Sequence, residues 1–216
     1  MPCPKHPRAS AAGEFCQVCL LEQALVSAPA RELVVHVPLG HGVDTAVFIV
    51  RQDAPTAALL RLKVWRRPAP DAFLDGVTAL IECLQAHTEH AIVAPLAAYL
   101  DDAGCPAVLS TFRQGVPILS AVKSGALACS AALDLLDSLG PVLDRCHGRG
   151  IAHGSIVPGN VLVDPAASSV FVVDFGLSQL TGRSALGDAP AADRAGLASI
   201  EQALRSSSAT LASSTV

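Results

Sequence analysis

Three cysteines and one histidine near the start of the chain have the spacing of a metal site. Cys3 and His6 form a CxxH pair, and Cys16 and Cys19 form a CxxC pair after nine intervening residues. Two ligands separated by two residues can bind one tetrahedral ion from a single turn, and four such ligands close the shell of a structural zinc ion. We predict that zinc supplies the folding energy of this short unit and has no catalytic role. The alternative is a set of free thiols on a flexible arm.

The other cysteines are scattered along the chain. They are Cys83, Cys105, Cys129 and Cys146, and we expect them to be buried as small apolar side chains. Seven cysteines is an odd number, and three of them sit beside a histidine at metal-ligand spacing. This usage favours a reducing cytoplasm over a disulfide framework.

A second group of polar residues flanks a short apolar hairpin in the last third of the chain. It consists of the triplet His153–Ser155, then Asn160, and after the hairpin the triplet Asp174–Gly176. This pattern resembles the catalytic loop and the metal-binding loop of protein kinases, H-R-D-x-x-x-x-N followed by D-F-G. The resemblance implies that Asn160 and Asp174 are oxygen ligands of the Mg²⁺ that accompanies ATP.

The pattern departs from the family at the position that matters most for the chemistry. Ser155 stands where the family has the catalytic aspartate, and Val157 stands where Ser/Thr kinases have a lysine. A serine hydroxyl is not a base near neutral pH, and a positioned general base contributes about 10²- to 10⁴-fold in rate. Phosphoryl transfer depends mainly on positioning, so loss of the base slows it without forbidding it. We expect a pseudokinase, in which the neighbouring His153 and Phe175 pack into the core.

Two segments of the first half resemble the nucleotide-binding parts of the same family. Gly40 and Gly42 begin a segment similar to the Gly-rich loop, whose backbone N–H groups approach phosphates, although Thr45 replaces the third glycine. A tight hairpin turn is the alternative interpretation. Lys63 matches the lysine that holds the α- and β-phosphates.

In the family that lysine pairs with a glutamate of the following helix. We predict Glu82 for this position and Asp75 as the second candidate, and the alternative is that the lysine and the acid are both solvated. Arg61 is a further departure, because residues two apart on a strand face the same side. The family has a small alanine there, beside the adenine ring, so Arg61 argues against ordinary ATP binding.

The end of the chain differs from the family in length. Only 42 residues follow Asp174, which implies a nearly deleted activation segment and a C-terminally truncated lobe. Asp193 resembles the aspartate that anchors the backbone of the catalytic loop. The alternative for Asp193 is a simple helix N-cap.

Residue patterns predict the elements that position these side chains. Strands are predicted from β-branched runs, and helices from apolar residues at helical spacing. The expected strands are 33–37, 46–50, 59–65, 92–93, 107–109, 161–163 and 170–173, and the expected helices are 73–84, 130–147 and 193–204. We further expect Gly148 and Gly150 to end the helix 130–147 in a left-handed turn.

The predicted fold class is α+β, a bilobal protein kinase-like fold with a shortened C-lobe and a small N-terminal zinc-binding unit. We divide the chain into a zinc knuckle and linker (1–27), an N-lobe (31–115), a truncated C-lobe (116–204) and a disordered tail (205–216). No secretory signal and no membrane span is expected, since charged side chains interrupt the apolar run 121–143. The composition of the whole chain, rich in Ala, Gly, Pro and Arg, hints at a bacterial origin.

A net charge of −4 without a basic stripe argues against nucleic acid as the partner. The leading hypothesis is a cytoplasmic, non-catalytic signalling module that binds a partner protein and retains nucleotide and Mg²⁺ binding through Lys63, Asn160 and Asp174. The second hypothesis is an active Ser/Thr kinase with a reassigned base. The third is an ATP-dependent transferase that moves a different group.

Overall fold

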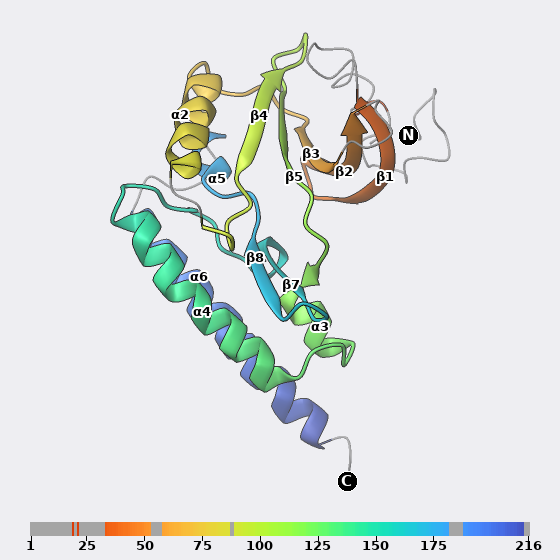
Figure 1. The fold of residues 1–216 in the computed structure, drawn as a ribbon, viewed down its shortest axis with the longest axis vertical. Helices are drawn as coiled ribbons and strands as arrows, with labels where there is room; N and C mark the ends of the chain where they lie inside the picture. Colours follow the sequence, from red (N-terminus) through yellow and green to blue (C-terminus); the bar gives the residue numbers. More distant parts are fainter. Residues whose placement is uncertain are drawn as a thin grey trace. The chain divides into compact units, whose positions relative to one another are not determined.

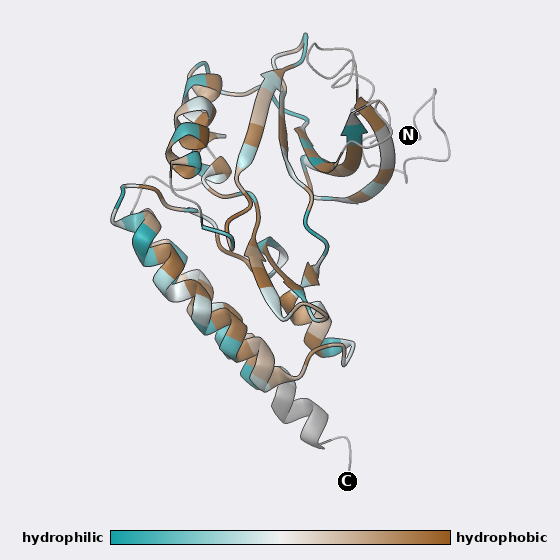
Figure 2. Ribbon diagram, viewed as in Figure 1, coloured by the Kyte–Doolittle hydropathy of each residue, from teal (hydrophilic) through white to brown (hydrophobic). Residues whose placement is uncertain are grey.

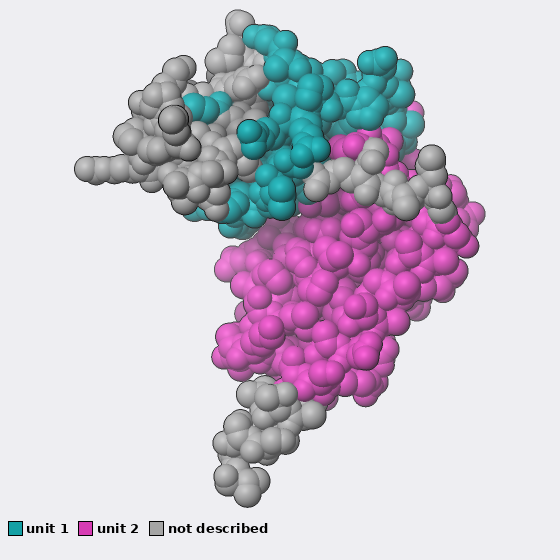
Figure 3. Space-filling model, turned by 180° about the vertical axis from the view of Figure 1, so that it is seen from behind, with its two compact units in different colours: residues 1–81, 95–112 teal, residues 82–94, 113–216 magenta. Residues whose placement is uncertain are grey.

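The computed structural model describes residues 19, 21, 33–52, 58–86, 89–181 and 188–213. The chain forms two compact units, shown in separate colours in Figure 3. The first comprises residues 1–81 and 95–112, and the second comprises residues 82–94 and 113–216. The segment 82–94, which the sequence analysis assigned to the N-lobe, thus clusters with the second unit.

The described part of the first unit is built on a five-stranded antiparallel sheet with the order β1-β2-β3-β5-β4 (Figure 1). Its strands are β1 (Leu33–His41), β2 (Thr45–Gln52), β3 (Leu59–Trp65), β4 (Pro95–Leu100) and β5 (Pro106–Thr111). The sequence did not predict β4, because it begins with a proline and contains adjacent alanines, which have low strand propensity. Its place at the edge of the sheet tolerates the proline.

One face of this sheet carries the core of the first unit. Alternate residues of β2 and β3 lie on it, among them Phe48, Val50, Leu62 and Val64, which are at most 3% exposed. Leu21, whose backbone is helical, is 8% exposed and belongs to the same cluster. Because side chains alternate along a strand, every second residue of β3 faces the other side of the sheet.

Helix α2 (Phe73–Gln85) follows β3, and the division between the units falls within it. Its predicted apolar face is confirmed, since Phe73, Val77 and Leu84 are buried. In the second unit, Ile92 makes a parallel bridge to Val172. The strand predicted at 92–93 is therefore only this bridge.

The second unit combines helices with a sheet that has the order β6-β7-β8 among the described residues. Its elements are β6 (Val116–Pro117), α3 (Ile118–Lys123), α4 (Cys129–His147), the 3₁₀ helix η2 (Pro158–Asn160), β7 (Val161–Asp164), β8 (Ser169–Val172), α5 (Leu177–Leu180) and α6 (Ala189–Ser213). The predicted hairpin is present as β7 and β8. Helix α3 and strand β6 are too short to leave a periodic signal, and the sequence did not predict them.

Helices α4 and α6 lie side by side and bury facing apolar side chains (Figure 1). The buried residues include Leu136, Leu139 and Leu143 on α4, and Ile200 and Leu204 on α6. Figure 2 shows apolar and polar residues alternating along α4, as expected for a helix with one buried face.

Two helix ends differ from the predictions. Of the two glycines expected in a left-handed turn after α4, Gly148 has a right-handed backbone, φ −61°, and only Gly150 is left-handed, with φ +76°. Helix α6 runs to Ser213, past residue 205, where the sequence predicted the start of a disordered tail.

Candidate functional site

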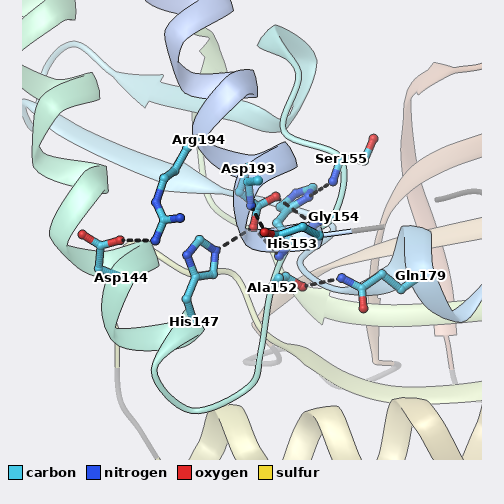
Figure 4. A network of polar contacts seen from close by, with 11 residues as sticks. Asp144, His147, Ala152, His153, Gly154, Ser155, Gln179, Asp193 and Arg194 are labelled. Atoms are coloured by element: carbon cyan, nitrogen blue, oxygen red, sulfur yellow. Dashed lines mark hydrogen bonds and ion pairs between the residues drawn. The ribbon is translucent and has the colours of Figure 1, made fainter. Parts of the chain in front are cut away.

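The loop after α4 is held by a single buried carboxylate. Asp193, which is 0% exposed, accepts hydrogen bonds from the backbone N–H groups of His153 and Gly154, both at 2.8 Å (Figure 4). The same carboxylate lies 2.9 Å from Nε2 of His147 at the end of α4. Three hydrogen bonds from two parts of the chain thus meet at one side chain of α6.

The geometry shows that Asp193 is the anchor of the loop and not a helix N-cap. Asp188 lies immediately before α6, and its Oδ1 accepts the N–H of Ala191 at 3.1 Å, which is the capping interaction. Asp193 lies within the first turns of the helix. Of the two interpretations of this residue, the anchor is confirmed.

A glycine lets α6 approach this loop closely. A Cβ atom on Gly196 would lie 2.5 Å from the backbone oxygen of Ile156. Gly196 is three residues after Asp193 and therefore on the same face of the helix. The helix thus presents both a polar anchor and a surface without a side chain to residues 153–156.

His153 is fixed in one orientation and one tautomer. Its ring is fully buried, with Nε2 at 2.9 Å from the backbone oxygen of Val173 and Nδ1 at 3.1 Å from the N–H of Ser155. Because a carbonyl can only accept, Nε2 carries the proton and Nδ1 is the acceptor. The ring also meets Phe175 edge-to-face at 5.5 Å. The expected core packing of His153 and Phe175 is confirmed.

Ser155 and Asn160 are neighbours in this loop. The side-chain nitrogen of Asn160 donates to the backbone oxygen of Ser155 at 3.1 Å, and Val173 donates its N–H to the backbone oxygen of Asn160 at 3.0 Å. The first bond uses the amide nitrogen of Asn160, whereas the amide oxygen is the atom that a cation would need. Ser155 itself is half-buried, and Val157 is 46% exposed.

Asp174 has an unusual backbone conformation. It is 7% exposed, its φ is +63°, and Gly176 two residues later has a φ of +72°. Left-handed backbone at a residue other than glycine costs free energy and is concentrated at functional sites. Asp174 and Asn160 follow and precede the β7–β8 hairpin, so the hairpin brings the two predicted Mg²⁺ ligands to its open end.

The predicted nucleotide-binding residues of the first unit share one face of its sheet. Arg61 and Lys63 are half-buried and lie opposite the core cluster, so the expectation that they share a face is confirmed. Arg61 is flanked across the strands by Ile49 and Ser110. Nζ of Lys63 lies 4.9 Å from the ring centre of the buried Trp65, which is a cation–π contact.

The nucleotide-binding roles expected of Gly40, Gly42 and Glu82 stay predictions. Gly40 is exposed within β1, and Gly42 begins the turn to β2, with its N–H bonded to the backbone oxygen of Thr45 at 2.9 Å. Glu82 is exposed on α2. It belongs to the second unit and Lys63 to the first, and each is placed only within its own unit.

Of the predicted zinc ligands, Cys3, His6 and Cys16 lie outside the described residues. Cys19 is half-buried in helical backbone. Among the residues that the structure describes, no group of three or more side chains could hold a metal ion. The zinc site therefore rests on the sequence spacing.

The structure also reveals an ion pair that the sequence analysis missed. Arg145 of α4 donates two hydrogen bonds, at 2.6 and 2.8 Å, to the carboxylate of Glu89. The bond from Arg145 lowers the pKa of Glu89 below its ordinary value, against the opposing effect of desolvation. Burial raises the pKa of the nearby Cys146 thiol, which keeps it protonated. Arg145 and Glu89 are 56 positions apart in sequence, so no local pattern predicts this ion pair.

Gln179 is a second residue that the sequence analysis missed. Its side-chain nitrogen lies 3.3 Å from the backbone oxygen of Ala152, and a Cβ on Gly154 would come within 2.8 Å of that nitrogen. The helix α5 that follows Asp174–Gly176 is thereby tied to the loop before Ser155 (Figure 4).

Comparison with known proteins assigns the architecture. No family model matches the chain. The serine/threonine-protein kinases PknA of Mycobacterium tuberculosis and of Mycobacterium bovis are each 36% identical over 66 residues, which is 30% of this chain and 15% of each relative. The chain therefore matches only a small part of the length of these curated relatives. That both are bacterial supports the origin suggested by the composition.

Solved structures extend the likeness to most of the chain. A double mutant of the M. tuberculosis PknI kinase domain gives a TM-score of 0.61 at 20% identity, over 77% of this chain and 72% of that one. The PknI kinase domain itself gives 0.59 at 20% identity, over 77% and 69%. Among the described residues, no helix has the length and apolar character needed to cross a membrane. The likeness to the PknI kinase domain shows that the chain has a protein kinase-like fold.

Proposed function

We propose that this chain is a pseudokinase that acts as a protein-interaction or regulatory module. The observation that carries the proposal is the loop around Ser155. Its backbone is fixed by Asp193 and its histidine is locked in the core, yet position 155, where the kinase pattern has the proton-accepting aspartate, is a serine. A serine there can donate or accept a hydrogen bond but cannot act as a base near neutral pH.

In this proposal the loop retains the capacity to hold a cation. Asn160 offers an amide oxygen and Asp174 a carboxylate, which are the hard oxygen ligands that Mg²⁺ prefers. When bound, Mg²⁺ would neutralise phosphate charge. The strained backbone of Asp174 supports a binding role, because such strain persists only where the surroundings enforce it.

The sheet face around Lys63 argues that nucleotide binding is weak. The half-buried residue Arg61 adds bulk and charge on the face that also carries Lys63, at the register position between Ile49 and Ser110. A flat aromatic ligand would have to displace this side chain. We therefore propose residual rather than tight ATP binding.

The amino-terminal Cys/His unit would bind structural zinc through Cys3, His6, Cys16 and Cys19. We propose that it braces the first unit or docks a protein partner. A pull-down that compares the wild type with Cys16→Ser tests the docking role. Partners captured equally by both proteins would contradict docking through the zinc unit.

The proposal is tested by measuring phosphotransfer with ATP and Mg²⁺ for the wild type and for Ser155→Asp. We expect little or no transfer by the wild type and a gain of up to about 10²- to 10⁴-fold on restoring the carboxylate. Ser138→Asp, at an exposed position of α4, controls for the added charge. Ser155→Asp/Asp174→Ala should abolish any gain. Robust wild-type transfer that Ser155→Asp leaves unchanged would refute the proposal.

An active kinase is the second candidate, and the presence of both Asn160 and Asp174 at the hairpin favours it. A transferase that moves a different group would use the same two residues. Mass spectrometry of the incubated protein separates these outcomes, because added phosphate and added nucleotide differ in mass.

A further inference from the structure

A surface pocket of about 280 Å³ lies in the second unit. The described residues that line it come from the end of α2, from the segment 89–94 and from Arg113, which follows β5 by two residues. All of them belong to the second unit, so the pocket lies within one unit. They do not include Ser155, Asn160 or Asp174, so this pocket is distinct from the kinase-like loop.

Part of the pocket wall is apolar and firmly held. Leu84 and Ile92 are only 6% and 8% exposed, and the half-buried Ala94 completes the apolar part of the lining. Ile92 bridges Val172 of β8, and the N–H of Val93 donates to the backbone oxygen of Val172 at 2.9 Å. This wall is therefore fixed on β8 and offers a preformed apolar surface to a ligand.

The charge of the one acid among the described lining residues is already compensated. This acid is Glu89, whose side chain is 15% exposed. Arg145 binds both oxygens of its carboxylate, at 2.6 and 2.8 Å, and Nη1 of Arg149 lies 3.9 Å from one of them. Two guanidinium groups around one carboxylate leave an excess of positive charge, which does not favour a cationic ligand.

The exposed rim of the pocket can bind an anion. Arg113 and His90 are exposed lining residues. Cζ of Arg113 lies 5.6 Å from the ring centre of Phe171 of β8, a cation–π contact that restricts the position of the guanidinium charge. His90 adds a ring N–H donor. A positive rim beside an apolar wall is complementary to an apolar group with a carboxylate next to it.

We propose that this pocket binds a segment of a partner protein in which a leucine-sized apolar side chain is flanked by carboxylates. The inference rests on the proposed role as a protein-interaction module and names the kind of partner. Sites that bury most of a small ligand have volumes of about 300–1,000 Å³. A pocket of about 280 Å³ with an exposed rim encloses one side chain, so the rest of the ligand lies on the surrounding surface, as a protein segment does.

NMR titration of the isotope-labelled full chain with the peptide acetyl-Asp-Leu-Asp-amide tests the proposal. The amide signals of His90, Ile92 and Arg113 should shift along one saturable curve, and those of Phe48 and Leu62 in the first unit should stay unchanged. The peptide with alanine in place of leucine should bind about tenfold more weakly, because it buries less apolar surface. The peptide with lysine in place of both aspartates should not bind.

Three variants test the two halves of the pocket separately. Arg113→Ala should weaken binding of the aspartate peptide about two- to fivefold, the range of an exposed ion pair. Arg51→Ala, at an exposed position of the first unit, should leave the affinity unchanged. Ala94→Leu fills the apolar part and should weaken binding about tenfold. If Ala94→Leu does not fold, Arg113→Glu at the exposed rim should weaken binding more than Arg113→Ala does.

Several results would overturn the proposal. They are the absence of a saturable shift at peptide concentrations up to about 10 mM, equal affinity for the aspartate and lysine peptides, and wild-type affinity in Arg113→Ala. Free 4-methylpentanoate that binds as tightly as the peptide would overturn a protein partner and assign the pocket to a small organic acid. An active wild-type kinase would refute the pseudokinase proposal without changing these titrations, because peptide binding needs no phosphotransfer.

Discussion

The loop around Ser155 and the sheet face around Lys63 differ from the kinase pattern in different ways. In the loop the supporting residues are complete, with Asp193 bonded to two backbone N–H groups and His153 bonded at both ring nitrogens. What is missing is one carboxylate. On the sheet face the lysine is present, and what differs is an added side chain, Arg61, beside it.

This difference shows that the residues that hold the backbone and core of this fold are distinct from the residues that would bind a ligand or react. Asp193, His153 and Phe175 act on backbone and core, and none of them needs a reacting group nearby. Ser155 and Arg61 are at positions whose side chains the core does not dictate. A serine or an arginine can therefore stand there without a penalty to folding, while the function proposed above loses the reaction or weakens the ligand.

The largest expected effect is on the scaffold side. Asp193→Ala removes the acceptor of two buried N–H groups and of His147, so it should lower the free energy of unfolding by about 3–5 kcal/mol. Urea denaturation followed by circular dichroism measures the loss. Asp188→Ala, which removes only the N-cap of α6, should cost about 1 kcal/mol. Equal losses for the two variants would mean that the anchor is no more than a helix cap.

A pair of glycines gives the next largest effect, with opposite signs. Gly196→Ala places a Cβ against the backbone of Ile156 and should destabilise the protein by about 1–3 kcal/mol. Gly159→Ala, at an exposed position of the 3₁₀ helix η2 with open space around the new atom, should stabilise it by about 0.4–1 kcal/mol. Thermal unfolding of the two variants decides this. Stabilisation by both would show that α6 can move away from the loop.

Much of the scaffold could be predicted from local patterns. The bounds of β3 agree with the prediction, and the bounds of α4 begin one residue earlier, because periodic apolar residues mark both elements. Asp193 was found through its resemblance to the family anchor. Its contact with His147, 46 positions away, depends on how α4 and α6 pack, and no local pattern contains that information.

Some features could not be predicted because tertiary contacts outweigh local preference. Strand β4 forms on pairing with β5 despite its alanines. The role of Gly196 is visible only from the distance to Ile156. Leu21 belongs to the core of the sheet although the sequence placed it in the zinc unit and linker.

The sheet face provides the third prediction. Arg61→Ala removes the bulk and charge beside Lys63, and it should raise the affinity for ATP and Mg²⁺ about tenfold, the equivalent of about 1.4 kcal/mol. Isothermal titration calorimetry measures the change. Arg51→Ala, at an exposed position of the neighbouring strand β2, controls for loss of a positive charge. Unchanged or weaker binding by Arg61→Ala would show that this arginine assists the ligand.

The smallest expected effect concerns the ion pair of Glu89 and Arg145. The pKa of Glu89 is lowered in the folded state by the hydrogen bond from Arg145, so the pair stabilises the fold above the unfolded pKa of about 4.3. This contribution disappears as the pH falls through the lowered folded pKa. The free energy of unfolding measured in urea should therefore be higher for the wild type than for Glu89→Gln near neutral pH. This difference should disappear in acid. Glu201→Gln, in an exposed pair on α6, controls for the change of charge. If the difference in the free energy of unfolding between wild type and Glu89→Gln grew as the pH fell, the ion pair would not stabilise the fold in the way proposed.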